Sequence, residues 1–500
     1  MPDAGNESDS SSVVSVTTPP SDRLRTYTAM DPPQLPNVTV IGGDVHQTEW
    51  NKHIWRYTAR KDIFGTGFEV RQMQIDTFDG YEVPDMADDN YWLPKYNLGP
   101  PTQTGYWNGL IEKWGFPVLE KAGFLNYYPR DGDDYIDPIG RLASKRNPSG
   151  DLDQRIHPVL RQDMWRDLDD DQYQTLEQVL LLASALLDDP ATLAIFHAIV
   201  DVNSMTEFND IDNGKCKVAH IPATLSDEQE AEVYRKILAM RDWMDWSFAP
   251  QKDMIRDNAL AITVRRYDGN GQEMRASSEH CHQSSIKICQ TFLDILRRYD
   301  EDISNGCGDV TTESLKAWSD LVHVPVTRRP RKLDGVSAYN RTCFFLAHTI
   351  VHEFFHAFNA AYFPVSDDQT PISPWLHGNR SNELGNATIN HLLGGEPFAM
   401  IRYGRSRAEQ RRQECAAPYG LWSAKQWDLW SETTDDKLVR ATTADRQQAF
   451  KTVQVFYPVP QKYVHNMTTR KTWTHQVPRY GLAALQVPKL EDWAIAMRKT

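Results

Sequence analysis

Cysteine is scarce in this sequence, and none of its six copies forms a CxxC pair. In a chain of 500 residues this pattern predicts free thiols rather than a disulfide framework. The first residues also lack the basic segment followed by an apolar segment that marks a secretory signal. We therefore expect an intracellular protein, located in the cytoplasm.

Long apolar runs and an excess of basic residues are missing as well. The best apolar run, Leu176 to Leu187, is far shorter than the ~20 residues that a membrane helix needs, so it predicts a core helix. The net charge of −14 argues against a general nucleic-acid binder, which needs a basic face. We expect neither a membrane nor a nucleic acid as partner, and the oligomeric state stays open.

Composition changes along the chain and predicts four regions. Residues 1–40 are rich in Ser, Thr, Pro and Asp without periodicity, which is typical of disorder. Residues 41–255 begin as an aromatic-rich, irregular region and continue with helical patterns. Residues 256–435 are expected to form the core, and residues 436–500 a C-terminal extension.

Local patterns predict several elements. Helices are expected from Asp171 to Leu187 and from Ala191 to Val200, and a Ser226–Gln229 capping box opens a third that reaches about Trp246. The alternating, β-branched segment Asn258 to Arg266 predicts a strand. A further helix is expected from Ser277 to Tyr299 on the basis of one apolar stripe: Ile286, Ile288, Phe292, Ile295 and Leu296.

The segment Asn340 to Tyr362 is apolar almost all round and predicts a buried helix, yet His348, His352 and His356 interrupt it. His352 to His356 reads HEFFH, an HExxH motif. Residues four apart share a helical face, so both imidazoles can bind one zinc ion. The alternative is a set of hydrogen-bonded core histidines.

Glu353 follows the first histidine and is rotated from it by roughly 100° around the helix, beside the metal rather than on it. In that position it can act as general acid and base toward a water molecule. Catalytic zinc sites have three protein ligands, and Glu383, at the start of an expected helix from Ser381 or Asn382 to Gly394, is our candidate for the third. The alternative is that Glu383 only complements the helix dipole.

The combination of HEFFHAF, NELG and a later Gly-Gly resembles the gluzincin metallopeptidases, and more narrowly a group of uncharacterised fungal zincin-like proteins. The resemblance covers about residues 340–396. It implies Zn²⁺ as cofactor, with His352, His356 and Glu383 as ligands and Glu353 as catalytic residue.

Two features depart from related patterns. Ala387 stands where thermolysin-like enzymes place an aspartate that orients a ligand histidine, and the third histidine of metzincins is replaced by Tyr362.

Several side chains remain as supporting candidates around the metal. His348 is either a ligand, a group behind the ligands or a core histidine. Asn386 or Asn390 can orient a ligand in place of the missing aspartate. For stabilising a developing oxyanion, four residues stay open: His377, His391, Tyr403 and Tyr419.

These observations predict an α+β, predominantly helical fold with a zincin-like core, in which a small sheet packs on the HExxH helix. The function expected is that of a zinc metallopeptidase whose edge strand binds an extended peptide. Two alternatives stay open: a zinc hydrolase or tailoring enzyme acting on a small amide or other molecule of a fungal secondary-metabolite pathway, and a non-catalytic protein with a structural zinc site.

Overall fold

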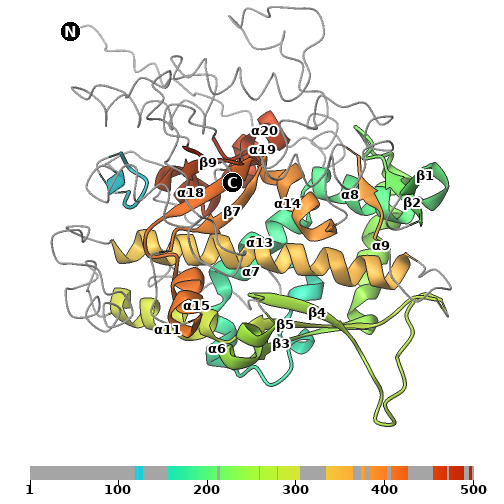
Figure 1. Ribbon diagram of the computed structural model, residues 1–500, viewed down its shortest axis with the longest axis horizontal. Coiled ribbons are helices and arrows are strands. Elements are labelled where there is room, and N and C mark those ends of the chain that lie inside the picture. The colour runs from blue at the N-terminus through green and yellow to red at the C-terminus, as the bar shows by residue number, and fades with distance from the viewer. Residues whose placement is uncertain are drawn as a thin grey trace, which may run out of the picture.

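One long helix, α13 (Gly335–Tyr362), runs through the middle of the fold (Figure 1). It begins where the Asp334 carboxylate accepts a hydrogen bond from the Ser337 backbone N–H at 2.9 Å. It ends one residue before the Phe363–Pro364 pair, because a residue preceding proline is disfavoured in a helix. The buried helix predicted from Asn340 to Tyr362 is confirmed, and the cap at Asp334 explains its earlier start.

The computed structural model describes only part of the chain, and every structural statement here concerns that part. The described residues are 119–120, 122–127, 156–210, 214–257, 259–278, 280–304, 334–363, 373–377, 383–401, 407–425, 454–469, 472–488 and 495–497. The predicted disordered segment 1–40 and the candidate Tyr403 lie outside it.

Several helices that precede α13 in the chain pack against it. α7 (Glu177–Leu187) and α8 (Pro190–Val200) both contact α13. α8 confirms the helix expected from Ala191 to Val200, whereas the helix expected from Asp171 to Leu187 is divided at Leu176 into a short helix, α6 (Asp170–Thr175), and α7. α9 (Asp227–Trp243) opens with the predicted capping box: Gln229 N–H donates to Ser226 Oγ at 3.3 Å, and Ser226 N–H donates to Gln229 Oε1 at 2.8 Å.

The remaining helical elements include α11 (Thr291–Ser304) and α14 (Leu384–Leu393), which both pack on α13, and several shorter helices. The others are η6 (Pro158–Leu160), η7 (Gln162–Met164), η8 (Val202–Ser204), α10 (Gln251–Arg256), α15 (Arg407–Ala416), α18 (Gln461–Met467), η10 (Thr472–Gln476), α19 (Val477–Tyr480) and α20 (Leu482–Leu485). No single helix among the described residues is long and apolar enough to cross a membrane; α7 and α8 pass only as a pair, bent by 62°.

A three-stranded sheet packs on α13 opposite α14 (Figure 1). Its order is β3 (Met244–Ala249), β5 (Ser284–Cys289), β4 (Ala261–Arg265), with β3 parallel and β4 antiparallel to β5. The strand expected within Asn258 to Arg266 is therefore confirmed as β4. Within the described residues β4 is an edge strand of this sheet.

The single helix predicted from Ser277 to Tyr299 is wrong. Ser284–Cys289 is strand β5, and helix α11 begins only at Thr291. Ile286 and Ile288 are fully buried while Lys287 between them is exposed, which is the alternation of a strand. The predicted apolar stripe therefore joined residues with the two-residue period of a strand to residues with the period of a helix.

Two more sheets complete the described part. One joins β1 (Thr206–Asp210), β2 (Gly214–Ala219) and β6 (Trp375–Leu376) in that order. The other has the antiparallel order β10 (Ile495–Met497), β9 (Gln454–Val459), β8 (Leu421–Lys425), β7 (Glu396–Ala399). The fold is thus α+β and predominantly helical, with small sheets. The predicted boundary at residue 435 falls between the paired strands β8 and β9, and the domain limits stay predictions.

Candidate metal centre

The two histidines of the HExxH motif lie on the side of α13 that faces α14. Their ring centroids are 5.0 Å apart, and both side chains are only partly exposed. α14 packs against α13, and Gly385 in the first turn of α14 lies against the His352 ring. As the four-residue spacing predicts, both imidazole rings lie on the same face of the helix.

Glu383 meets these histidines from the start of α14. Its Oε1 is in hydrogen-bond contact with His356 Nε2 and lies 3.5 Å from His352 Nε2. Its Oε2 accepts the Asn386 backbone N–H at 2.5 Å, which makes Glu383 the N-cap of α14. The N-cap predicted at Ser381 or Asn382 is therefore wrong, whereas Gly394 ends the helix in a left-handed conformation (φ 68°) as expected.

These contacts make a compact donor set. One ligand atom from each of His352, His356 and Glu383 lies within 4.8 Å of the others. Two imidazole nitrogens and one carboxylate oxygen suit a divalent cation that accepts mixed nitrogen and oxygen ligands. The three residues predicted as ligands from the sequence therefore lie together, and their donor atoms are suited to binding a metal ion.

Charge couples the members of this cluster. Burial acts to raise the pKa of Glu383, but the hydrogen bond from His356 and the charges of both histidines hold it at about 2. Burial acts to lower the pKa of His356, but the hydrogen bond and charge of Glu383 raise it above its ordinary value. For His352 burial prevails over the nearby carboxylates, and its pKa is lowered.

Glu353 lies beside this donor set and is only 6% exposed. Its Oε1 is 3.9 Å from His352 Nε2, and its Oε2 accepts a hydrogen bond from Thr263 Oγ at 2.7 Å. Thr263 belongs to β4, so the edge strand and the HExxH helix meet at this carboxylate. The sequence gives no sign of this pairing, which joins positions 90 apart.

Two further neighbours were missed by the sequence analysis. A Cβ built on Gly385 would lie 2.5 Å from the His352 ring, so glycine allows that imidazole to rest on α14. Glu396 in β7 is a carboxyl whose pKa is raised to about 8 by burial and by the charge of Glu383. The NELG sequence contained a signal for Gly385, whereas none marked Glu396.

His348 lies in the core rather than in the donor set. It is 4% exposed and packs edge-on against the rings of Phe344 and Phe345, and its Nε2 has no hydrogen-bond partner among the described residues. Burial, followed by the charge of His352, lowers its pKa to about 3. These contacts match the core-histidine alternative.

The other supporting candidates are less closely connected with the metal centre. Asn386 touches Glu383 through its backbone N–H. His391 lies near the end of α14, and burial lowers its pKa to about 4. His377 is exposed beside His220, with ring centroids 4.8 Å apart, and Tyr419 is buried. Their roles stay predictions.

Comparisons of the chain with protein-family models, with curated proteins and with solved structures found no match.

Proposed function

We propose that this chain is a zinc-dependent hydrolase that cleaves peptide bonds. The observation that carries the proposal is the convergence of His352, His356 and Glu383, with the Glu353 carboxylate beside them. This set is the two-histidine, one-glutamate ligation of catalytic zinc, which leaves one position open. The zincin-like core and the likeness to gluzincins belong to the same proposal.

The chemistry follows from what each residue can do. Zinc, when bound by these ligands, supplies acidity to a water molecule and polarises the carbonyl to be attacked. Glu353 accepts the proton from the attacking water at Oε1, the oxygen nearer His352, and then delivers it to the departing amine nitrogen. The proposed zinc ligands, His352, His356 and Glu383, neither accept nor donate a proton in these steps.

Strand β4 supports the choice of a peptide as substrate. It is an edge of the β3–β5–β4 sheet within the described residues, and its Thr263 contacts Glu353. An extended peptide can add to such an edge by backbone hydrogen bonds, which brings its carbonyl groups past the adjacent carboxylate. A purely structural zinc site would hold four protein ligands, whereas the described residues bring three together, so peptide hydrolysis is favoured.

Zinc content tests the proposal together with hydrolysis. We expect one zinc per chain by mass spectrometry in the wild type and in Glu353→Gln, and its loss in Glu383→Ala. Glu353→Gln should lower peptide hydrolysis by roughly 10²- to 10⁴-fold, the usual contribution of a general base. A wild type that binds no zinc when purified without chelators would overturn the proposal.

A panel of peptides, small amides and esters separates the enzyme classes. Cleavage of peptides supports the proposal. Cleavage of small amides or esters alone would replace it by a small-molecule hydrolase. Zinc binding with hydrolysis that is insensitive to Glu353→Gln would reject the assigned base.

A further inference from the structure

We propose that Thr263 is a positioning residue of this centre, and that its hydroxyl fixes the orientation of the Glu353 carboxylate. The inference rests on the proposed function, because it assigns a role relative to the general base. Its observations are the contacts between strand β4 and helix α13.

The hydroxyl of Thr263 has two acceptors on the same residue. Its Oγ lies 2.7 Å from Glu353 Oε2 and 3.0 Å from the Glu353 backbone oxygen. A hydrogen bond to an ionised carboxylate is shorter and stronger than one to a carbonyl, so the proton goes to Oε2. Within the described part of the chain, no other hydrogen bond reaches this buried carboxylate.

Anchoring one oxygen orients the other. With Oε2 bound to Thr263, Oε1 is the oxygen near His352 Nε2, at 3.9 Å. The two oxygens therefore have separate tasks: Oε2 keeps the hydrogen bond from Thr263, and Oε1 takes up the water proton and gives it away. The Thr263 proton stays on its own oxygen, so the number of protons balances without it.

The register of the sheet explains why position 263 can do this. Thr263 lies opposite Ile286 of β5, and Ile286 lies opposite Trp246 of β3. Ile286 and Trp246 are fully buried, so this row of side chains faces the core and α13. A strand side chain at 263 is thereby directed at the helix.

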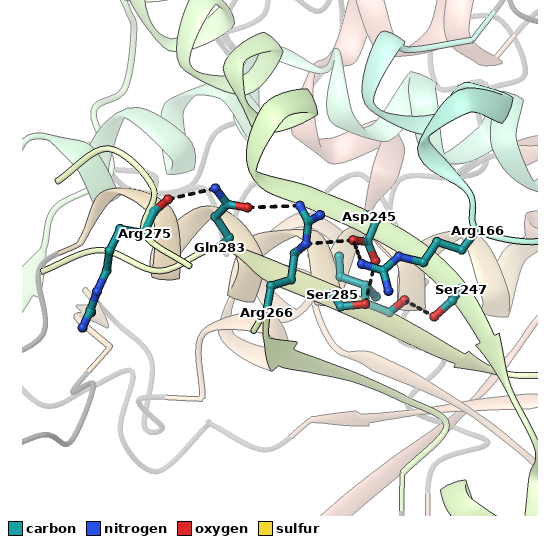
Figure 2. A network of polar contacts seen from close by, with 8 residues as sticks. Arg166, Asp245, Ser247, Arg266, Arg275, Gln283 and Ser285 are labelled. Carbon is teal, nitrogen blue, oxygen red and sulfur yellow. Dashed lines mark hydrogen bonds and ion pairs between the residues drawn. The ribbon is translucent and has the colours of Figure 1, made fainter. Parts of the chain in front are cut away.

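On either side of the Trp246–Ile286–Thr263 row, the polar side chains of β3 make contacts that do not involve Glu353. Asp245 lies opposite Ser285 and accepts a hydrogen bond from its hydroxyl at 2.6 Å, and it pairs with Arg166 and Arg266 (Figure 2). Ser247 lies two residues after Asp245 on β3 and therefore faces the same side of the sheet. Its hydroxyl donates to the Ile286 backbone oxygen. Ser247 therefore offers a hydroxyl of the same sheet that is not in contact with Glu353.

The arrangement connects substrate binding to catalysis. If an extended peptide adds to β4, the strand that holds the peptide also holds the base through Thr263. The positions of the peptide carbonyl and of Glu353 Oε1 relative to each other are then both set by strand β4. Removing the hydroxyl should leave peptide binding largely intact and impair the chemical step.

Thr263→Val removes the hydroxyl at nearly constant shape, Thr263→Ala removes it with less volume, and Thr263→Ser keeps it. Ser247→Ala is the matched control. For each variant we would measure zinc content, acetohydroxamate affinity by calorimetry, and kcat and KM on the best-cleaved peptide. Acetohydroxamate binds zinc and presents a hydroxyl to the general base, so its affinity reports carboxylate position without turnover.

We expect Thr263→Val and Thr263→Ala to retain one zinc per chain. Both should lose roughly 10- to 100-fold in hydroxamate affinity and in kcat, the range found for residues that orient metal-site groups, with little change in KM. Thr263→Ser should recover most of both, and Ser247→Ala should match the wild type.

Unchanged hydroxamate affinity and kcat in a folded, zinc-bound Thr263→Val or Thr263→Ala would overturn the inference. The same holds if Thr263→Ser fails to recover them, because packing of the methyl group would then be the cause. A wild type without zinc would overturn the proposed function itself, and the zinc assay distinguishes this from failure at Thr263 alone.

Discussion

The imidazole of His352 rests directly against Gly385, so closely that a Cβ on that glycine would stand 2.5 Å from two ring atoms and 2.6 Å from a third. Gly385→Ala should strengthen the α14 helix by roughly 0.5–1 kcal/mol on propensity alone. The added methyl group must nevertheless displace the His352 ring. We therefore expect zinc affinity, measured by competition with a chelator, to fall by roughly 10- to 100-fold.

Gly269→Ala is the matched control for this variant. A Cβ on Gly269 meets nothing within 4 Å, so zinc affinity should stay at the wild-type value. If Gly385→Ala binds zinc as tightly as the wild type, the position of His352 on α14 does not depend on glycine.

His348→Leu should keep one zinc per chain. The His348 imidazole packs against Phe344 and Phe345, and its Nε2 lacks a hydrogen-bond partner in the described structure. A buried polar group without a partner costs roughly 1–3 kcal/mol, so the free energy of unfolding should be unchanged or higher. Zinc analysis and denaturant titration measure the two effects. His352→Leu, which removes a proposed ligand, should lose the metal, and loss of zinc from His348→Leu would identify His348 as a ligand.

Arg341→Met should destabilise the whole fold. The guanidinium is fully buried and donates to the backbone oxygens of Ala417 (2.7 Å), Pro418 (3.0 Å) and Leu125, and to Gln461 Oε1 at 2.6 Å. Methionine leaves these acceptors without a donor, at a cost of roughly 1–3 kcal/mol each. We expect the free energy of unfolding to fall by more than about 3 kcal/mol.

Arg256→Met provides the comparison for Arg341. The Arg256 side chain is 72% exposed, so the change should remain within about 0.5 kcal/mol. Equal effects of the two substitutions would show that the Arg341 hydrogen bonds contribute little.

Features that depend on residues close together in the chain were predictable from the sequence. The Ser226–Gln229 capping box, the buried helix around HEFFH and strand β4 depend on residues within a few positions of one another. The same is true of His352 and His356, whose relation is set by one helical turn. For such features local geometry determines the outcome.

The incorrect helix at Ser277 to Tyr299 shows where local patterns are ambiguous. Ile286 and Ile288 are spaced by two, as in a strand, and Phe292, Ile295 and Leu296 by three and four, as in a helix. The change of period occurs between Cys289 and Thr291, where β5 ends and α11 begins. Taken as one stripe, the apolar residues concealed that change.

Contacts between distant segments could not be predicted. Thr263 reaches Glu353 across 90 positions. Gln486 donates from its Nε2 to the His391 and Leu392 backbone oxygens at 3.0 and 3.2 Å, and so caps α14 from the C-terminal region. A hydroxyl or amide has many acceptable partners, and only the fold selects one.

Zinc affinity should fall by about tenfold per pH unit below the raised pKa of His356. Glu383 raises that pKa against the effect of burial, so the free His356 imidazole holds a proton at the nitrogen that the metal needs. Glu383, with a pKa of about 2, stays ionised, and the lowered pKa of His352 keeps that ring neutral. One proton is then released per zinc bound, which sets a slope of one.

Calorimetry in buffers of different ionisation enthalpy counts the released proton directly, and chelator competition at several pH values gives the slope. Glu383→Gln removes the charge that raises the pKa of His356, so burial should then lower it. In that variant the affinity is weaker throughout, and its decline with acid begins at lower pH. A slope of two in the wild type would mean that His352 is also protonated before zinc binds, which contradicts the effect of its burial.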